Sequence, residues 1–544
     1  MTPAPPAALL LALLLAGCSS PATPPPSATP SGAASSGAAS SGTGPTTAPT
    51  TSPATTGLAD VAGSVTGTGQ VAGNDVQYRV RPVVRQGDHA VVTVDLTLVR
   101  ATGATSARST SAPVGVYFQD PFREQNGRLS FAAVRLVDLT RRQVYLAARA
   151  DRAVAATAVA RGVAGGTAVS GQVAFAALPA AVTEIGVLIG NLGYVTVPVV
   201  DGEIPVVNDT TADLADVNPR TRRQLTPADV AAATDAPVVA LDSFTEQIGL
   251  RARAGTQALR VSLDTEVLFR LDSAVLTPAA ATALATAAAQ LRARAASGRV
   301  DVVGYTDDTG STAHNLELSR ARARAVEQAL AGTTPGLRLV AAGKGEADPA
   351  VPNDGEAGRR LNRRVELTLS APARAASPLT AGTGPSPALR PGTPTARGRA
   401  AATVAAASPA GAPLAVSAPS VLRREGALVV TLQVTNSDPT RNGAIGGLFA
   451  SGALSARGTF TPREQFSANA VRLLAGPQVV HPYDYPSPGP LGERSTLTDL
   501  LVNEPVRAVR GRQAVTAVFP DVPGATVTID VPGVVRLLDV PVTG

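Results

Sequence analysis

The sequence predicts a multidomain chain in which a central α/β (α+β) domain lies between two related β-sandwich domains, behind a disordered N-terminal tether. Three observations lead to this prediction. Residues 257–370 alternate strand-like and helix-like patterns in the order βαβαβ, the segments on either side contain short strand-like runs, and small residues and proline dominate the first part of the chain. The length of 544 residues suits two to four domains, at roughly 150 residues each.

Composition argues against several classes of protein. The net charge is +6, yet Lys344 is the only lysine and no block of like charge is present, so we expect no nucleic-acid binding. Cys18 is the only cysteine, which excludes an intramolecular disulfide and a multi-cysteine metal site. His89, His314 and His481 have no ligand-spaced partners, so we expect no metal and no cofactor. No nucleophile elbow or phosphate loop occurs, so we do not expect an enzyme.

The N-terminal segment indicates an export signal with a lipid anchor. The apolar run Ala7–Gly17 is too short to cross a bilayer core, which requires roughly twenty residues. Leu15-Ala16-Gly17-Cys18 resembles a bacterial lipobox, whose cysteine is acylated, although no Lys or Arg precedes the run. We therefore expect a lipoprotein signal peptide at 1–17, palmitate on Cys18 and a disordered linker over 18–57. A plain signal peptide followed by a chance cysteine is the alternative.

Residues 58–207 are expected to form the first β-sandwich. The run His89–Val99 alternates apolar and polar residues, as a half-buried strand does. Further short strands are expected at Val114–Phe118, Ala133–Val137, Gln172–Phe175, Ile185–Ile189 and Tyr194–Val200. Residues 208–256 are expected to connect this domain to the next, with a short helix after Thr226-Pro227.

The last part of the chain repeats the first β domain. After a Pro/Ala-rich linker at 371–414, residues 415–544 contain the same short motifs in the same order and at nearly constant separation. The matched pairs are Ala90–Thr97 with Leu428–Thr435, Arg123-Glu124-Gln125 with Arg463-Glu464-Gln465, Ala133–Leu136 with Ala470–Leu473, Phe175 with Phe519, and Val197–Val199 with Val540–Val542. The repeat predicts a second, related β-sandwich.

The central domain, 257–370, is expected to form one sheet with helices on one side. Its expected strands are Leu259–Phe269, Arg299–Tyr305, Leu337–Ala342 and Val365–Leu369. One helix is expected from an N-cap at Thr277, with Pro278 in its first position, to about Ala296. Leu284, Ala288 and Leu291 share one face of that helix. A second helix is expected from a cap at Asn315 to about Leu330.

Two charged residues of the central domain suggest chemistry. Asp307 follows the strand that ends at Tyr305, and Arg322 lies in the next helix. A carboxylate and a guanidinium at one cleft can hold a zwitterionic ligand through charge-assisted hydrogen bonds. They can equally form a structural ion pair, and spacing alone does not decide between these two interpretations.

Three ordered blocks resemble the C-terminal domain of OmpA-like proteins. The blocks are Val267-Leu268-Phe269 with Asp272-Ser273-Ala274, then Gly304–Ser311 with Asn315–Ala323, then Gly343–Glu346 with Gly358–Glu366; Leu271 replaces the usual Phe of the first block. The resemblance implies that Asp307 and Arg322 hold the amino and carboxylate groups of diaminopimelate in the peptidoglycan stem peptide. It implies Asn315, Thr306 and Arg363 as supporting contacts.

The resemblance thus predicts an envelope lipoprotein that binds peptidoglycan non-covalently and ties a membrane to the cell wall. The anchor would lie in the outer membrane of a two-membrane cell, facing the periplasm, and otherwise on the outer face of the cytoplasmic membrane. In the alternative hypothesis, the β-sandwiches recruit a protein partner and wall binding only localises the protein. A membrane-spanning porin barrel is not expected, because regular amphipathic strands of about ten residues are missing.

Overall fold

A computed structural model describes residues 61–71, 74–100, 111–112, 131–150, 153–157, 163–164, 168–190, 192–207, 225–372, 384–406, 411–445, 448–450, 457–458, 460, 464, 467–488, 493–499, 505–506 and 511–544. The expectations for the signal peptide, Cys18, the tether and the strand Val114–Phe118 lie outside the described residues. Within those residues, no helix has the length and apolar character needed to span a membrane. Likewise, no group of three or more His, Cys, Asp or Glu side chains in the described segments could hold a metal ion.

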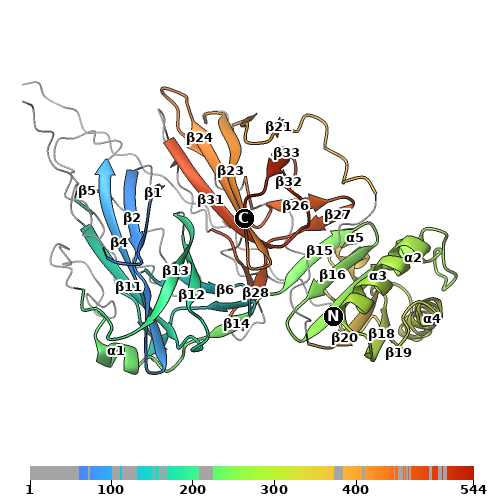
Figure 1. Cartoon of the computed structure of the whole chain (residues 1–544). Coiled ribbons are helices and arrows are strands. Elements are labelled where there is room, and N and C mark those ends of the chain that lie inside the picture. The colour runs from blue at the N-terminus through green and yellow to red at the C-terminus, as the bar shows by residue number, and fades with distance from the viewer. Residues whose placement is uncertain are drawn as a thin grey trace, which may run out of the picture. The chain divides into compact units, whose positions relative to one another are not determined.

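The first β region is built on one mixed sheet (Figure 1). Its strands run in the order β1-β2-β4-β3-β13-β12-β6-β7-β14, and β11 pairs with β4. They are β1 (Val65–Val71), β2 (Asn74–Val80), β3 (Val83–Gln86), β4 (His89–Arg100), β6 (Arg135–Asp138), β7 (Gln143–Tyr145), β11 (Ala168–Ala176), β12 (Glu184–Ile189), β13 (Gly193–Asp201) and β14 (Val238–Ala240). Two-residue strands β5 (Ser111–Ala112), β8 (Arg149–Ala150), β9 (Ala153–Val154) and β10 (Val163–Ala164) and the 3-10 turn η2 (Phe131–Ala133) accompany it.

The central domain has the expected mixed α/β character. Its strands are β15 (Ser243–Gln247), β16 (Leu250–Ala254), β17 (Ala258–Asp264), β18 (Gly298–Tyr305), β19 (Leu337–Gly345) and β20 (Arg364–Ser370), in the sheet order β19-β18-β20-β17-β16-β15. Only the β18–β19 pair is parallel. The helices are α2 (Thr265–Leu268), α3 (Ala280–Arg294), α4 (Thr312–Ala331) and α5 (Gly355–Asn362). Leu284, Ala288 and Leu291 of α3 are buried in a shared core with Val326 of α4 and Val302 of β18.

Several expected boundaries in this domain were wrong. The strand expected at Leu259–Phe269 ends at Asp264, and α2 follows it directly. Helix α3 begins at Ala280 rather than Pro278. The Thr277 hydroxyl donates to the Val267 carbonyl (2.6 Å) and accepts from the Ala280 amide (3.3 Å), so Thr277 caps the turn that leads into the helix. Helix α4 is capped by Ser311, which accepts a hydrogen bond from the His314 amide, so Asn315 lies inside the helix. Helix α5 was not expected.

The C-terminal β region starts earlier than expected. Strands β21 (Thr395–Arg397) and β22 (Ala402–Val404) fall inside the segment 371–414 that was expected to be a linker, and they pair with β33 and β23. The other strands are β23 (Leu414–Arg424), β24 (Ala427–Asn436), β25 (Gly443–Ala444), β26 (Arg472–Ala475), β27 (Gln478–Val480), β28 (Asp484–Pro486), β29 (Arg494–Thr496), β30 (Pro505–Val506), β31 (Gly511–Pro520), β32 (Thr526–Val531) and β33 (Val535–Pro541).

The repeated motifs that fall within the described residues occupy matching positions in the two β regions, whereas Arg123-Glu124-Gln125 lies outside those residues. Phe175 pairs with Ala90 across β11 and β4, and Phe519 pairs with Leu428 across β31 and β24. Both phenylalanines are fully buried. Strand β6 pairs with β7 and β12, just as β26 pairs with β27 and β32. The repeat in sequence is therefore a repeat in strand pairing.

The connecting segment, expected at 208–256, is more structured than the sequence suggested. Its helix α1 (Pro227–Ala231) is capped by Thr226, as expected. Beyond it, β14 pairs with β7 of the first β region, whereas β15 pairs with β27 of the C-terminal region. Residues 238–247 thus add a neighbouring strand to β7 in the first region and to β27, the equivalent strand, in the C-terminal region. A buried apolar cluster that includes Leu188, Leu241 and Tyr485 lies between the two regions.

Candidate ligand-binding site

Asp307 lies at the carboxyl end of β18 and carries a buried charge. One carboxylate oxygen accepts hydrogen bonds from the Thr309 amide (3.1 Å) and hydroxyl (2.5 Å), and the other accepts a hydrogen bond from Arg363 Nη1 (2.7 Å). Burial raises the pKa of the Asp307 carboxyl, but the hydrogen bonds from Thr309 and Arg363 outweigh it and hold this pKa below the usual value. Asp307 is therefore an anion at neutral pH. A carboxylate has about four acceptor positions, so one remains for a ligand.

Arg363 holds Asp307 in place. It follows the last residue of α5, and its guanidinium also contacts Glu266 and Glu356. Burial lowers the pKa of Arg363, but hydrogen bonds with Glu266, Asp307 and Glu356 raise it further above its ordinary value. The sequence-predicted supporting residue Arg363 thus belongs to the site, as the ion-pair partner of Asp307.

Arg322 lies on α4, and its side chain is buried while its two Nη groups remain available as hydrogen-bond donors. Its Nε donates to the Ser273 carbonyl (3.0 Å), and its guanidinium stacks 5.5 Å from the centre of the Phe269 ring. Within the described residues it forms no ion pair with Asp307 and its two Nη groups donate no hydrogen bond, although neither is sealed from solvent. Burial lowers the pKa of Arg322, while the charges of Asp272 and Asp307 act in the opposite direction. The structural ion pair between Asp307 and Arg322 is therefore not formed.

Asn315 and Thr306 connect the turn to its surroundings. Asn315 is buried and donates to Glu346 (2.7 Å) and, more weakly, to the Asp307 carbonyl (3.5 Å). The Thr306 hydroxyl donates to the same carbonyl (2.8 Å), and its amide donates to Gly345 (2.8 Å). These bonds hold the backbone of Asp307 in place. Thr306 and Asn315 therefore position the Asp307 carboxylate and make no hydrogen bond to the carboxylate oxygens.

Close backbone packing brings α4 against the end of β18. A Cβ added to Gly304 would lie 2.2 Å from the Ser319 carbonyl oxygen, and one added to Gly343 would lie 2.4 Å from the Arg320 amide nitrogen. Only glycine allows this approach. It carries Asn315 and Arg322 to the turn that holds Asp307.

Sequence analysis missed four residues of the site: Thr309, Ser273, Glu346 and Phe269 contact Asp307, Arg322 or Asn315 directly. All of them lie within or beside the three quoted blocks, but spacing does not reveal which block residues touch. Asp308 is exposed, as are Arg320 and Arg324 on α4.

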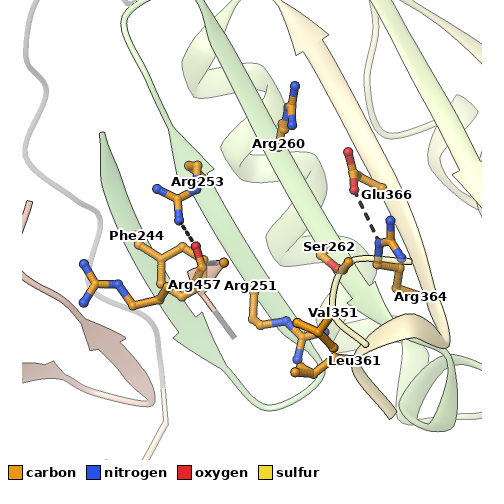
Figure 2. Close-up of a pocket in the computed structure, with 12 residues that line it drawn as sticks. Phe244, Arg251, Arg253, Arg260, Ser262, Val351, Leu361, Arg364, Glu366 and Arg457 are labelled. Atoms are coloured by element: carbon orange, nitrogen blue, oxygen red, sulfur yellow. Dashed lines mark hydrogen bonds and ion pairs between the residues drawn. The ribbon is translucent and has the colours of Figure 1, made fainter. Parts of the chain in front are cut away.

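A separate pocket lies on the other face of the central sheet. It has a volume of about 190 Å³ and is lined by Phe244, Arg251, Arg253, Arg260, Ser262, Ala350, Val351, Leu361, Arg364, Glu366, Arg457 and Gly458 (Figure 2). None of the five expected site residues contributes to it.

The central part of the chain is thus a mixed α/β domain that places an ion-paired carboxylate and a partly unpaired guanidinium at one strand-to-helix turn. The OmpA family matches residues 268–363, so this part of the chain is an OmpA family domain. "Outer membrane porin F" of Pseudomonas fluorescens is 39% identical over 120 residues, which cover 22% of this chain and 36% of that protein. "Probable lipoprotein YiaD" of Escherichia coli K12 is 39% identical over 113 residues, covering 20% and 50%.

"Peptidoglycan-binding protein ArfA" of Mycobacterium tuberculosis H37Rv is 37% identical over 105 residues, covering 19% of this chain and 32% of that protein. The chain thus spans half or less of the length of these relatives. The likeness is confined to about one fifth of this chain, so it describes the domain and not the β regions.

Proposed function

We propose that the protein binds peptidoglycan non-covalently and attaches to the cell wall through its OmpA family domain. The observation that carries this proposal is the state of Arg322. Its guanidinium is buried and held by Ser273 and Phe269, yet both Nη groups lack a partner within the described residues. Because the rest of the guanidinium is held in place and the Nη groups are not sealed from solvent, these donors are available to an anionic ligand, which favours a role in ligand binding over a structural role.

The proposed ligand is the diaminopimelate of the stem peptide, and it binds as a zwitterion. Its ammonium group donates to the free acceptor position of Asp307, and its carboxylate accepts from the Nη groups of Arg322. Asn315, Thr306 and Arg363 keep Asp307 in position. The name of the mycobacterial relative, a peptidoglycan-binding protein, supports this ligand class.

The protein is proposed to act as an envelope lipoprotein without catalytic activity. Acylation at Cys18 would anchor it in the outer membrane of a two-membrane cell, or on the outer face of the cytoplasmic membrane otherwise. The name of the Escherichia coli relative, a probable lipoprotein, supports this anchor. The two β regions, proposed to be related sandwiches, would then hold the wall-binding domain away from the membrane.

Co-sedimentation with purified peptidoglycan tests the proposal. The chain from Ser19 onward is expected to bind diaminopimelate-type walls, and Asp307→Asn and Arg322→Gln are each expected to weaken binding by about a hundredfold, because each leaves a charged ligand group unpaired. Asp308→Asn and Arg320→Gln are matched controls, since each alters an exposed neighbour of the same type. Unchanged binding in both site variants would refute the site.

A wall that carries lysine in place of diaminopimelate sharpens the experiment. Lysine lacks the second carboxylate, so the wild-type chain should bind this wall more weakly. Arg322→Gln should then cause little further loss, whereas Asp307→Asn should still reduce binding. Equal losses for Arg322→Gln on both walls would contradict the pairing of Arg322 with that carboxylate.

A further inference from the structure

The pocket on the open face of the central sheet is unusually rich in arginine. Helices α3 and α4 pack on one face of the sheet through Val261, Leu263 and Val365, so the intervening residues Arg260, Ser262, Arg364 and Glu366 lie on the other face. Five of the twelve described residues that line the pocket are arginines, and Glu366 is the one carboxylate among these twelve.

The register of the paired strands brings the arginine side chains of the pocket close together. Arg253 lies directly opposite Arg260 across β16 and β17, and Arg251 lies opposite Ser262. Ser262 in turn lies opposite Glu366 of β20. Like charges at opposed positions destabilise a sheet. An arrangement that places Arg253 beside Arg260 is therefore unfavourable unless anions compensate it.

Ion pairs within the protein compensate only part of this charge. Arg251 pairs with Asp264, and Arg253 and Arg457 both pair with Asp484. Arg364 reaches Glu366 at 3.5 Å, and within the described residues Arg260 has no carboxylate within 4.0 Å. The pocket arginines and their ion-pair network comprise seven arginines and four carboxylates among the described residues: Arg251, Arg253, Arg260, Arg360, Arg364, Arg457 and Arg494 with Asp242, Asp264, Glu366 and Asp484. Positive charge is therefore in excess.

Among the described residues, buried donors of the pocket also lack partners. Arg364 is only 6% exposed, and its guanidinium stacks 3.8 Å from the centre of the Tyr305 ring. Its Nη2 donates to the Asp348 carbonyl (3.3 Å), but its Nη1 is buried without a hydrogen bond. The buried hydroxyl of Ser262, on the neighbouring strand, has no partner either. Figure 2 shows Ser262 and Arg364 on adjacent strands beside Glu366. Buried polar groups normally find partners, so unpaired donors in a positively charged pocket indicate a missing acceptor.

We propose that this pocket is a second binding site, distinct from the Asp307 turn, and that it binds a phosphate group. A phosphate group offers two or three acceptor oxygens in a tetrahedral arrangement and one or two negative charges, which suit the donors of Arg364, Ser262 and Arg260 on adjacent strands and the excess of positive charge. The phosphate can be a free inorganic ion or a group on an anionic envelope polymer.

Titration with inorganic phosphate, followed by calorimetry and by the melting temperature, tests the proposal on the chain from Ser19 onward. Saturable binding is expected, with affinity about tenfold lower in Arg260→Gln and in Ser262→Ala. Acetate at the same concentration should bind much more weakly. Arg299→Gln is the matched control, because Arg299 lies on β18 of the same sheet, outside the pocket, and pairs with Asp301.

The Ser262→Ala variant separates binding from folding. The Ser262 hydroxyl has no hydrogen-bond partner among the described residues, so without phosphate the melting temperature of the variant should equal or exceed that of the wild type. Asp307→Asn should retain phosphate binding, which keeps this proposal distinguishable from wall binding. The proposal is overturned if the wild type shows no saturable binding, or if Arg260→Gln and Ser262→Ala both bind like the wild type.

A soluble poly(glycerol phosphate) chain distinguishes the two sources of phosphate. If the physiological ligand is a polymer, this chain should bind more tightly than inorganic phosphate, and inorganic phosphate should displace it from the wild type. If the ligand is the free ion, only inorganic phosphate should bind. Tight polymer binding that survives in both Arg260→Gln and Ser262→Ala would contradict the assignment to this pocket.

Discussion

Arg363 Nη1 donates to Asp307 Oδ2 at 2.7 Å, although the two residues are 56 positions apart in the chain. This ion pair joins the end of α5 to the end of β18. Asp307 pairs with Arg363 and not with Arg322. The Nη groups of Arg322 therefore stay available to a ligand.

Replacing Arg363 by Gln should weaken wall binding by about tenfold without direct loss of a ligand contact. Asp307, Glu266 and Glu356 would then face one another without their shared cation. Like charges at short range disfavour the ionised carboxylate, so less Asp307 anion would be held in position. Co-sedimentation measures the loss. Arg360→Gln, on the exposed side of α5, is the control and should bind normally.

Wall binding should be insensitive to pH across the neutral range. The pKa of Asp307 lies below its usual value near 3.9, so its carboxylate persists as pH falls to about 5 and is lost only as pH falls through the lowered pKa. The contribution of Asp307 to folding stability is present above the unfolded pKa and disappears in the same acidic range. An NMR titration of the Asp307 carboxyl carbon checks whether the pKa of this group is lowered. A midpoint above the usual value would contradict the assignment, and Arg363→Gln should move the midpoint upward.

Gly304→Ala should damage both stability and binding. Its new Cβ would overlap the Ser319 carbonyl oxygen and push α4 from β18, at a cost of about 1–3 kcal/mol in the free energy of unfolding. Arg322 and Asn315 would move with the helix, so wall affinity should fall as well. Gly332→Ala at the end of α4 is the control: φ there is −76° and its space is open. Equal melting temperatures for the two variants would rule out the proposed close packing.

Folding stability should fall in mild acid because of His481. This residue is buried on the edge of the Phe244 ring, 3.6 Å from Glu246, and burial together with nearby Arg457 lowers its pKa despite that carboxylate. The folded protein therefore keeps His481 neutral while the unfolded chain takes up a proton below about pH 6.5. The free energy of unfolding should drop by up to about 1.4 kcal/mol per pH unit below that point.

Urea denaturation between pH 7.5 and 5.5 measures the effect of His481. His481→Gln should flatten the pH dependence, because glutamine does not titrate. His314→Gln, at an exposed position beside Asp272, should leave it intact. An unaltered pH dependence in His481→Gln would assign the effect to another group.

Local pattern was sufficient for the body of the central domain. The Thr277-Pro278 start signal and the spacing of Leu284, Ala288 and Leu291 located α3 and its buried face, and the apolar run before Asp307 located β18. Boundaries were less accurate: Ser311 rather than Asn315 caps α4, and the expected strand Leu259–Phe269 ends at Asp264, where α2 begins. The strands β21 and β22 were missed because their Pro- and Ala-rich sequence resembles a linker, whereas in the structure they pair with β33 and β23.

The sequence by itself determined the family of the central domain and the identity of its charged residues, because the blocks around Asp307, Arg322 and Arg363 are contiguous in the chain. Only the tertiary structure decided which of these residues pair. It joins Asp307 to Arg363, leaves the Nη groups of Arg322 without a partner in the described part of the chain, and gathers Arg260, Ser262 and Arg364 on the opposite face of the sheet. Pairing depends on distances across strands and helices that are far apart in sequence, and such distances are fixed only when the sheet is assembled.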